Sequence, residues 1–373
     1  MQTKLLLDPN DLSREALELC DDPHTGDLFR SAKWLTEVAV AGLQPGDRLR
    51  ILLCQDDAAL PATVALLPAV YSRLYGSHPG ARVLHFLQRE EQPYAPIGHD
   101  FDLAEVAQGL VRKLGETPKA FDVVRVSPFN AGQRFTEVLI PALRRCGYWV
   151  QLYYQTRSHY AAVAGQNFAQ YLAQRPRALR ELLDLNTRLL MQGGRGAFHF
   201  PCTPELLDDA WDTICMVLDR APVEDAPDSL TYLHALMMVA AQAGALRVGI
   251  FSLDGEPVAI QLWVINGRVA RCLRIWGAQG QRTFPIDDVL TQMVALCLID
   301  GDKVEELEFG DVSEEFAQDW APQARERLAL AAFNRRTALG VKGALRHITL
   351  PWLTRLPRRL WSHLLGKRLP GRP

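Results

Sequence analysis

The sequence predicts an α/β protein with two mixed sheets flanked by helices, in which one unit occurs twice. The clearer copy lies at residues 246–310. Three β-rich runs there are separated by Asp254-Gly255 and by Asn266-Gly267, dipeptides that tolerate the positive φ angles of tight antiparallel turns. Pro285 then opens a helix, and a last β-rich run ends at Phe309. The predicted order is three strands of a meander, a helix and a crossover strand.

An earlier segment repeats this order. The segment 49–65, an apolar run followed by acidic residues and a second β-rich run, corresponds to the segment 246–260. The helix and strand expected within 103–127 correspond to those within 286–310. We therefore predict an internal repeat of one mixed α/β unit. The alternative is that two unrelated halves merely share common hairpin patterns.

Local patterns place the individual elements. Apolar residues at three- and four-residue spacing, as at Leu103, Val106 and Leu110, predict core-facing helices, and Pro176 predicts a kink or a break in the middle segment. The expected strands are residues 48–54, 60–67, 81–87, 121–127, 148–154, 246–253, 258–264, 268–276 and 304–309. The expected helical segments are residues 1–45, 103–114, 132–145, 166–200, 204–218, 230–242 and 285–301.

Composition bounds the class of protein. At 373 residues, 48% hydrophobic and 23% charged, the chain has the composition of an ordered protein of two ordinary domains, which excludes disorder over most of its length. We expect domains at 1–165 and 166–340 and a separate tail at 341–373. The N-terminus shows no signal-peptide pattern, and we expect a cytoplasmic protein. Seven scattered cysteines without a CxxC pair favour reduced thiols over disulfides or a metal site.

The tail is the one strongly charged region. Residues 341–373 contain eight Lys or Arg and no acidic residue, although the whole chain carries a formal net charge of -2. Trp352, Trp361 and several leucines lie among these cations, a mixture that suits a helix at the surface of an anionic membrane. Pro351 and Pro357 shorten any such helix, and packing against the body or a partner protein is the alternative reading.

The order of elements, together with four short segments, resembles a known family. These segments are LFRSAKW at 28–34, AQRPRALREL at 173–182, the strand pair LRVGIFSLDGEPVAIQLWV at 246–264 and Phe309-Gly310-Asp311. They resemble the GNAT-fold acyltransferases of the CelD-like or BioF-like kind, which are related to the FemAB aminoacyl ligases. The resemblance implies a tandem GNAT fold that transfers an acyl group to an amine or hydroxyl. It also implies acyl-CoA as co-substrate, with acyl carrier protein as another possible donor, and acceptors in envelope or exopolysaccharide pathways.

In such folds a splayed strand pairs with the pantetheine of the donor, and the next helix N-terminus holds its pyrophosphate. Gly277 and Gly280 permit close backbone approach there, and Arg282 can neutralise a phosphate. However, the glycine spacing departs from the family signature, and Asp287 and Asp288 would repel a diphosphate, so an ordinary capped loop is the alternative. The implied donor-binding residues are Leu273, Ile275, Trp276, Gly277, Gln279, Gly280, Gln281 and Arg282.

Acyl transfer by this fold needs a base or a water chain that removes a proton from the acceptor. The candidate bases near the strand end are Asp311, preferred because it follows the strand beside the donor site, Glu308 and Glu314. An ordinary solvated turn is the alternative for Asp311. No histidine pairs with a cysteine in a local motif that would indicate a cysteine nucleophile. Arg175, Arg177 and Arg180 are candidates for holding an anionic acceptor, or else form a solvated helix face.

Two further hypotheses remain open. The family often has a lysine shortly after the strand-end glycine, and Phe316 and Trp320 stand in that region instead, as packing residues. A binding or scaffold protein that kept the fold and lost the donor site is therefore the alternative function. The first copy has Pro93-Tyr94-Ala95-Pro96 where a phosphate loop would lie, which predicts a degenerate, structural role for it. Use of aminoacyl-tRNA is disfavoured, because the acidic body offers no broad basic face for nucleic acid.

Overall fold

The computed structural model of the chain describes residues 2–21, 27–56, 58, 62–75, 78–86, 96–98, 101–117, 119–222, 227, 229–277, 284–310 and 312–349. Its strands are β1 (Gln2–Leu6), β2 (Arg48–Gln55), β3 (Thr63–Tyr75), β4 (His78–Phe86), β5 (Val123–Asn130), β6 (Tyr148–Ala162), β7 (Gly196–His199), β8 (Leu246–Leu253), β9 (Glu256–Asn266), β10 (Val269–Gly277), β11 (Glu306–Phe309) and β12 (Gln323–Asn334). Its α-helices are α1 (Arg14–Cys20), α2 (Ala39–Ala41), α3 (Leu103–Glu116), α4 (Arg134–Arg145), α5 (Phe168–Ala173), α6 (Arg177–Thr187), α7 (Pro204–Arg220), α8 (Leu230–Gln242), α9 (Ile286–Leu296), α10 (Glu314–Trp320) and α11 (Ala338–Ala344).

Both halves of the chain contain the order of elements that the sequence predicts. In the first, β2, β3 and β4 form an antiparallel meander, and α3 crosses over to β5, which runs parallel to β4. In the second, β8, β9 and β10 form the meander, and α9 crosses over to β11, which runs parallel to β10. Mixed sheets of this kind arise because a helical crossover joins parallel strands and a tight turn joins antiparallel ones.

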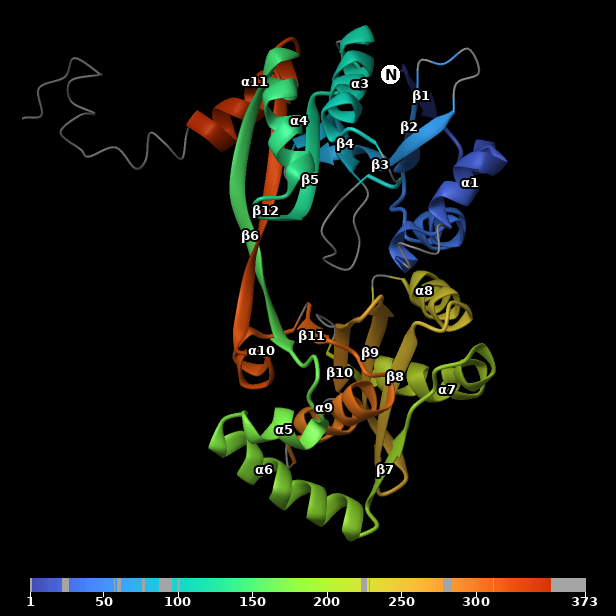
Figure 1. The fold of residues 1–373 in the computed structure, drawn as a ribbon, viewed down its shortest axis with the longest axis vertical. Coiled ribbons are helices and arrows are strands. Elements are labelled where there is room, and N and C mark those ends of the chain that lie inside the picture. The colour runs from blue at the N-terminus through green and yellow to red at the C-terminus, as the bar shows by residue number, and fades with distance from the viewer. Residues whose placement is uncertain are drawn as a thin grey trace, which may run out of the picture.

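The expectation of two separate sheets is wrong, because the strands form one continuous sheet of 12 strands in the order β1-β2-β3-β4-β5-β12-β6-β11-β10-β9-β8-β7. The long strands β6 and β12 connect the halves (Figure 1). They pair antiparallel from Gln323↔Tyr160 to Asn334↔Tyr148. At the other edge of each, β12 pairs with β5, and the end of β6 pairs with β11. Each half therefore places its last strand against the other half.

Three strands differ from the sequence expectations. Residues 323–334 carry no predicted element, because the run Leu328–Phe333 consists of alanine, leucine and phenylalanine without strand-like alternation. Pairing with β5 on one side and β6 on the other makes this segment a buried strand, so tertiary contacts override its helical propensity. β1 lies in the segment expected to be helical, where it pairs with β2, and β7 ends the middle helical segment by pairing with β8.

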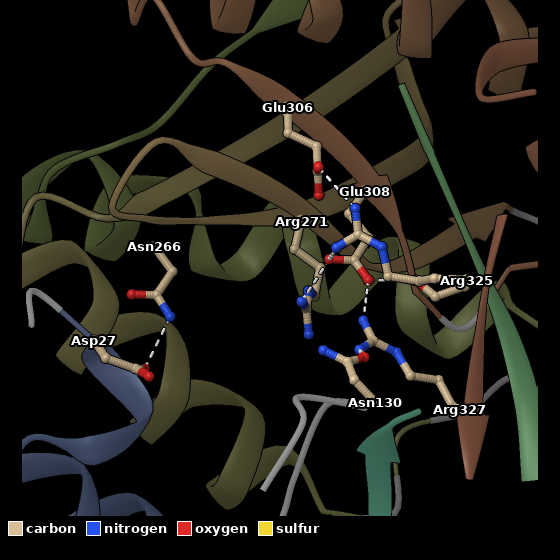
Figure 2. A network of polar contacts seen from close by, with 9 residues as sticks. Asp27, Asn130, Asn266, Arg271, Glu306, Glu308, Arg325 and Arg327 are labelled. Carbon is tan, nitrogen blue, oxygen red and sulfur yellow. Dashed lines mark hydrogen bonds and ion pairs between the residues drawn. The ribbon is translucent and has the colours of Figure 1, made fainter. Parts of the chain in front are cut away.

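Helices cover both faces of the sheet in the second half. On one face α7 and α8 pack against β8 and β9, and the core continues into Trp34 and Val38 of the first half. On the other face α9, α5 and α6 pack against the same strands. At the boundary between the halves, Asp27 accepts a hydrogen bond of 2.8 Å from Asn266 at the end of β9. This boundary is the region toward which Arg271 and Glu308 project from β10 and β11 (Figure 2).

Two chain-wide features follow from the fold. All seven cysteines are free thiols, as their scattered spacing predicts. Among the described residues no helix combines the length and apolar character that crossing a membrane requires.

Residues 341–349 continue α11 and pack toward β4 and β12, whereas the rest of the tail and the Pro93-Tyr94-Ala95 segment lie outside the described residues.

Candidate functional site

The strands β10 and β11 pair over a short distance and then part. They are parallel partners from Val269↔Glu306 to Cys272↔Phe309, where β11 ends. Immediately afterwards β10 contains a bulge, in which Leu273 is an extra residue without a register partner on β9. Residues 274–277 then have β9 as their one strand partner in the described part of the chain. β11 therefore does not pair with the last four residues of β10.

Gly310 fixes the point at which the strands part. Its N–H donates a hydrogen bond of 3.0 Å to the carbonyl oxygen of Cys272. A Cβ at position 310 would lie 2.9 Å from that same oxygen. Because a real Cβ does not approach a backbone oxygen so closely, only glycine lets the chain turn away here without displacing β10.

The predicted donor-binding residues divide into three groups. Leu273 and Trp276 are buried in the core on the side of α7, so their side chains are not available to a ligand. Ile275 and Gly277 are half-buried at the end of β10. Gln279, Gly280, Gln281 and Arg282 lie outside the described residues.

The helix that follows begins with two carboxylates. Solvent reaches Asp287, but the protein surrounding it raises its pKa to about 6, and the charge of Asp288 adds to the shift. Burial also raises the pKa of Asp288, against the effect of a 2.9 Å hydrogen bond from Trp320. Asp287 lies next to Gly277, since a Cβ there would be 3.6 Å from the carboxylate. Any anion at this helix start meets an acidic group that is partly protonated near neutral pH.

Glu308 lies at the centre of a buried polar cluster (Figure 2). Its Oε1 accepts hydrogen bonds from Ser158 of β6 and from Arg327 of β12. Its Oε2 accepts a bond of 2.6 Å from Nη2 of Arg271 on β10 and lies 4.0 Å from Arg325. Burial raises the pKa of Glu308, but the charges of Arg271 and Arg327 and the Ser158 hydroxyl outweigh it, so this pKa lies below its ordinary value. Glu308 is consequently a weak base.

The arginines of this cluster are not equally satisfied. Arg327 also donates to the side-chain oxygen of Asn130 on β5, and its Nε has no partner within the described structure. Arg325 bonds Glu306 at 2.7 Å, and its guanidinium stacks 3.8 Å from the Tyr160 ring. Arg271 is 6% exposed, yet its Nε and Nη1 have no hydrogen-bond partner within the described structure. Buried donors without partners are rare, because each one forfeits its bonds to water.

Of the other predicted bases, Asp311 lies outside the described residues. Glu314 is exposed at the start of α10, where it pairs with Arg157 at 3.2 Å. Its Oε1 lies 3.8 Å from Nε2 of His159, a buried histidine whose Nδ1 is 3.2 Å from the carbonyl oxygen of Ala321. Glu314 and His159 therefore form a second polar pair close to the end of β11.

Two of the three arginines that the sequence suggested for an anionic acceptor have other partners, and the third, Arg180, is exposed on α6. Arg175 is buried and donates to the carbonyl oxygen of Trp320 at 2.6 Å, and Arg177 pairs with Glu181 on the surface of α6. Sequence reasoning missed Arg271 and Arg327 instead. A charged residue between apolar neighbours, as in Val269-Ala270-Arg271-Cys272-Leu273, was the available sign, because a cation in a central strand must find a buried partner.

Residues 177–318 match the family model described as an acetyltransferase (GNAT) domain. This segment belongs to the GNAT acetyltransferase domain family. The fold around the GNAT domain is shared with solved structures of low identity. FemX has 10% identity and a TM-score of 0.56, with 93% of this chain and 100% of FemX covered. A conserved protein of unknown function from Bacteroides thetaiotaomicron has 11% identity and a TM-score of 0.52, with 87% and 98% covered. None of the curated proteins matches this chain.

The polar cluster extends beyond the GNAT domain. Arg271 and Glu308 lie inside the matched residues 177–318. Ser158 and Asn130 precede the GNAT domain, and Arg327 follows it. The exchange of β6 and β12 brings these residues to the splayed strands, so the GNAT domain alone does not contain the complete cluster.

Proposed function

We propose that this protein is an acyltransferase that moves an acyl group from acyl-CoA to an amine or hydroxyl of an acceptor. The observation that carries this proposal is that β10 continues to Gly277, whereas its parallel partner β11 ends at Phe309, opposite Cys272. Pantetheine contains two amide groups, and an extended amide chain adds to a strand edge through the same hydrogen bonds as another strand. β10 and β11 part at Gly310, inside the residues that match a GNAT acetyltransferase domain, and this position supports the proposed pairing with pantetheine.

The remaining parts of the donor follow from this placement. The thioester would lie near the bulge at Leu273, where a backbone N–H without a strand partner can polarise the carbonyl. The diphosphate would lie at the loop before α9, where Gly277, Gly280 and Arg282 were predicted to bind it. The helix N-terminus favours an anion, and Asp287 opposes it unless its carboxylate is protonated.

In the reaction, the acceptor nitrogen or oxygen attacks the thioester carbon, its bond to the acyl carbon forms, and the carbon–sulfur bond breaks. The acceptor proton passes to a base, and the CoA thiolate takes up a proton. For the base we propose Asp311 or Glu314, because both follow the end of β11 in the sequence. Glu308 instead orients Arg271 and Arg327, since its pKa is lowered and its oxygens are occupied.

The second candidate function is a binding protein of the same fold without catalysis. Its supporting observation is that Glu308, a buried carboxylate on β11, is bonded to two arginines and a serine and is therefore a weak base. Envelope or exopolysaccharide synthesis is the setting we propose for either function, on the resemblance described from the sequence.

Isothermal titration with acetyl-CoA and with longer acyl-CoAs tests donor binding. We expect binding by the wild type and weaker binding by Arg282→Glu. The matched control is Arg268→Glu at the opposite end of β10, where the exposed Arg268 pairs with Glu305. Release of free CoA thiol in the presence of amine acceptors separates the two functions. Binding without thiol release favours the binding protein, and no binding of acyl-CoA or acyl carrier protein by the wild type rejects the enzyme.

A further inference from the structure

We propose that Arg271 binds an anionic group, a carboxylate or a phosphate, on the acceptor. This inference rests on the proposed acyl transfer, because it assigns a chemical class to the second substrate. The polar cluster around Glu308 lies where β10, β11, β6 and β12 meet, next to the point at which the donor edge begins.

Among the described arginines of this cluster, Arg271 has two buried nitrogens without a partner and Arg327 has one, its Nε. Both oxygens of Glu308 are occupied, one by Ser158 and Arg327 and the other by Arg271. Nη2 of Arg271 is therefore satisfied, whereas its Nη1 and Nε are buried and without a partner. Its side chain is only 7% exposed, so bulk water does not replace the missing acceptors. In Figure 2 the guanidinium projects from β10 past Glu308 toward the side on which Asn130 lies.

The net charge of the cluster also favours binding of an anion. Three guanidinium groups, of Arg271, Arg325 and Arg327, face two carboxylates, of Glu306 and Glu308. Ser158 and Asn130 add no charge. One positive charge is thus uncompensated where burial strengthens electrostatic interactions, and a ligand anion that accepts a hydrogen bond from Nη1 both neutralises this charge and satisfies that donor.

The position of Arg271 also limits the distance between the anionic group and the reacting group of the acceptor. Arg271 precedes the bulge residue Leu273 by two positions on β10, which corresponds to roughly 6–7 Å along a strand. The reacting amine or hydroxyl would accordingly lie within a few bonds of the anionic group. An amino acid or a phosphorylated amino sugar has this spacing, whereas a neutral amine does not supply the anion.

The test uses the full-length protein, with inorganic phosphate and acetate as probes at constant ionic strength. The thermal midpoint is measured for the wild type, Arg271→Gln, Arg271→Lys and the control Arg268→Gln, whose guanidinium is exposed in the turn that precedes β10. Comparison with the control removes general salt effects on stability. We expect at least one probe to raise the midpoint of the wild type and of the control, with an affinity about ten- to a hundredfold lower in Arg271→Gln.

Circular dichroism establishes that each variant is folded. If Arg271→Gln does not fold, Arg271→Lys decides, because lysine keeps the charge beside Glu308 but loses the planar fork, and we expect affinity to fall at least several-fold. Equal responses in the wild type and the Arg271 variants, or no response to either probe, overturn the proposal. The probe that raises the thermal midpoint shows whether the site binds a carboxylate or a phosphate. Acetyl-CoA titration of the same variants keeps the two proposals apart, since donor binding should persist when the Arg271 site is lost.

Discussion

Ser158 of β6 donates a hydrogen bond to Glu308 of β11, although 150 positions separate them in the chain. Both are buried, and the bond joins the end of one half of the sequence to the splayed strand of the other. The same carboxylate holds Arg271 and Arg327. Glu308 thus links β6 and β12, the strands that connect the two halves, to Arg271 in the candidate site.

Removing the charge of Glu308 should destabilise the protein strongly. Glu308→Gln leaves the buried Arg327 and Arg271 without a counter-charge, for which we expect a loss of about 3–5 kcal/mol in the free energy of unfolding. Urea unfolding measures this, with Glu305→Gln in the exposed pair with Arg268 as control, where the loss should stay below about 1 kcal/mol. Similar losses in both variants would contradict the assigned role of Glu308.

The same variant has a predictable pH dependence. Because the folded-state pKa of Glu308 is lowered, its stabilising contribution is present above its unfolded value near 4.5 and is lost as pH falls through the folded pKa. Wild type and Glu308→Gln should therefore approach the same stability in acid. A difference that grows as pH falls would show that the carboxylate acts in another way.

Gly310→Ala tests the splay of the strands. The added Cβ meets the carbonyl oxygen of Cys272, so β10 or β11 must shift, and we expect a loss of about 1–3 kcal/mol in stability together with weaker acyl-CoA binding. Gly301→Ala is the control, because a Cβ there has no neighbour within 4 Å. Acetyl-CoA titration and urea unfolding of both variants measure the effects; unchanged binding in a folded Gly310→Ala variant counts against the β10 edge as the donor site.

Asp287 should make both stability and donor binding depend on pH. Its pKa of about 6 lies above its unfolded value of 3.8, so the folded state favours the neutral form and stability is lost as pH rises through 6. Asp287→Asn should therefore be more stable than the wild type at pH 7.5 and not at pH 4. The exposed Asp208→Asn on α7 serves as control in thermal unfolding.

Donor binding should follow the same titration. Below pH 6 the neutral Asp287 no longer repels a diphosphate at the start of α9, so acyl-CoA should bind more tightly to the wild type at pH 5.5 than at pH 7.5. In Asp287→Asn this difference should shrink to the part that belongs to the phosphates themselves. An equal pH response in wild type and variant would place the diphosphate away from Asp287.

The basic tail should direct the protein to anionic membranes. The described part of it packs on the body, since Ala344 is buried and the carbonyl oxygen of His347 accepts a 2.8 Å hydrogen bond from Gln151. A deletion should therefore begin at residue 350. We expect the full chain to sediment with phosphatidylserine vesicles and the deletion variant to remain in solution; equal sedimentation rejects membrane binding by residues 350–373.

The local order of helices and strands could be predicted from the sequence, whereas the pairing between distant strands could not. Turns such as Asp254-Gly255 and helix caps are set by neighbouring residues, so the meanders and crossovers could be predicted. The strand at 323–334 could not, because its alanines and leucines become a strand only through β5 and β6. The candidate site shows the same division.

The strand end at Phe309-Gly310 could be predicted from the residues, whereas the parting of β10 from β11 was expected only from the family resemblance. The partners of Glu308 are not legible, because Ser158, Arg271 and Arg327 come from three strands whose registers are set by the exchange. Those registers depend on contacts up to about half the chain apart.

The order of synthesis gives the exchanged strands a further consequence. β5 and β6 leave the ribosome long before β12, the strand that lies between them in the sheet. Until residue 334 has been made, both expose unpaired edges, which are the groups through which nascent chains aggregate. The centre of the sheet can therefore be completed only after β12, the last strand of the described residues, has been synthesised.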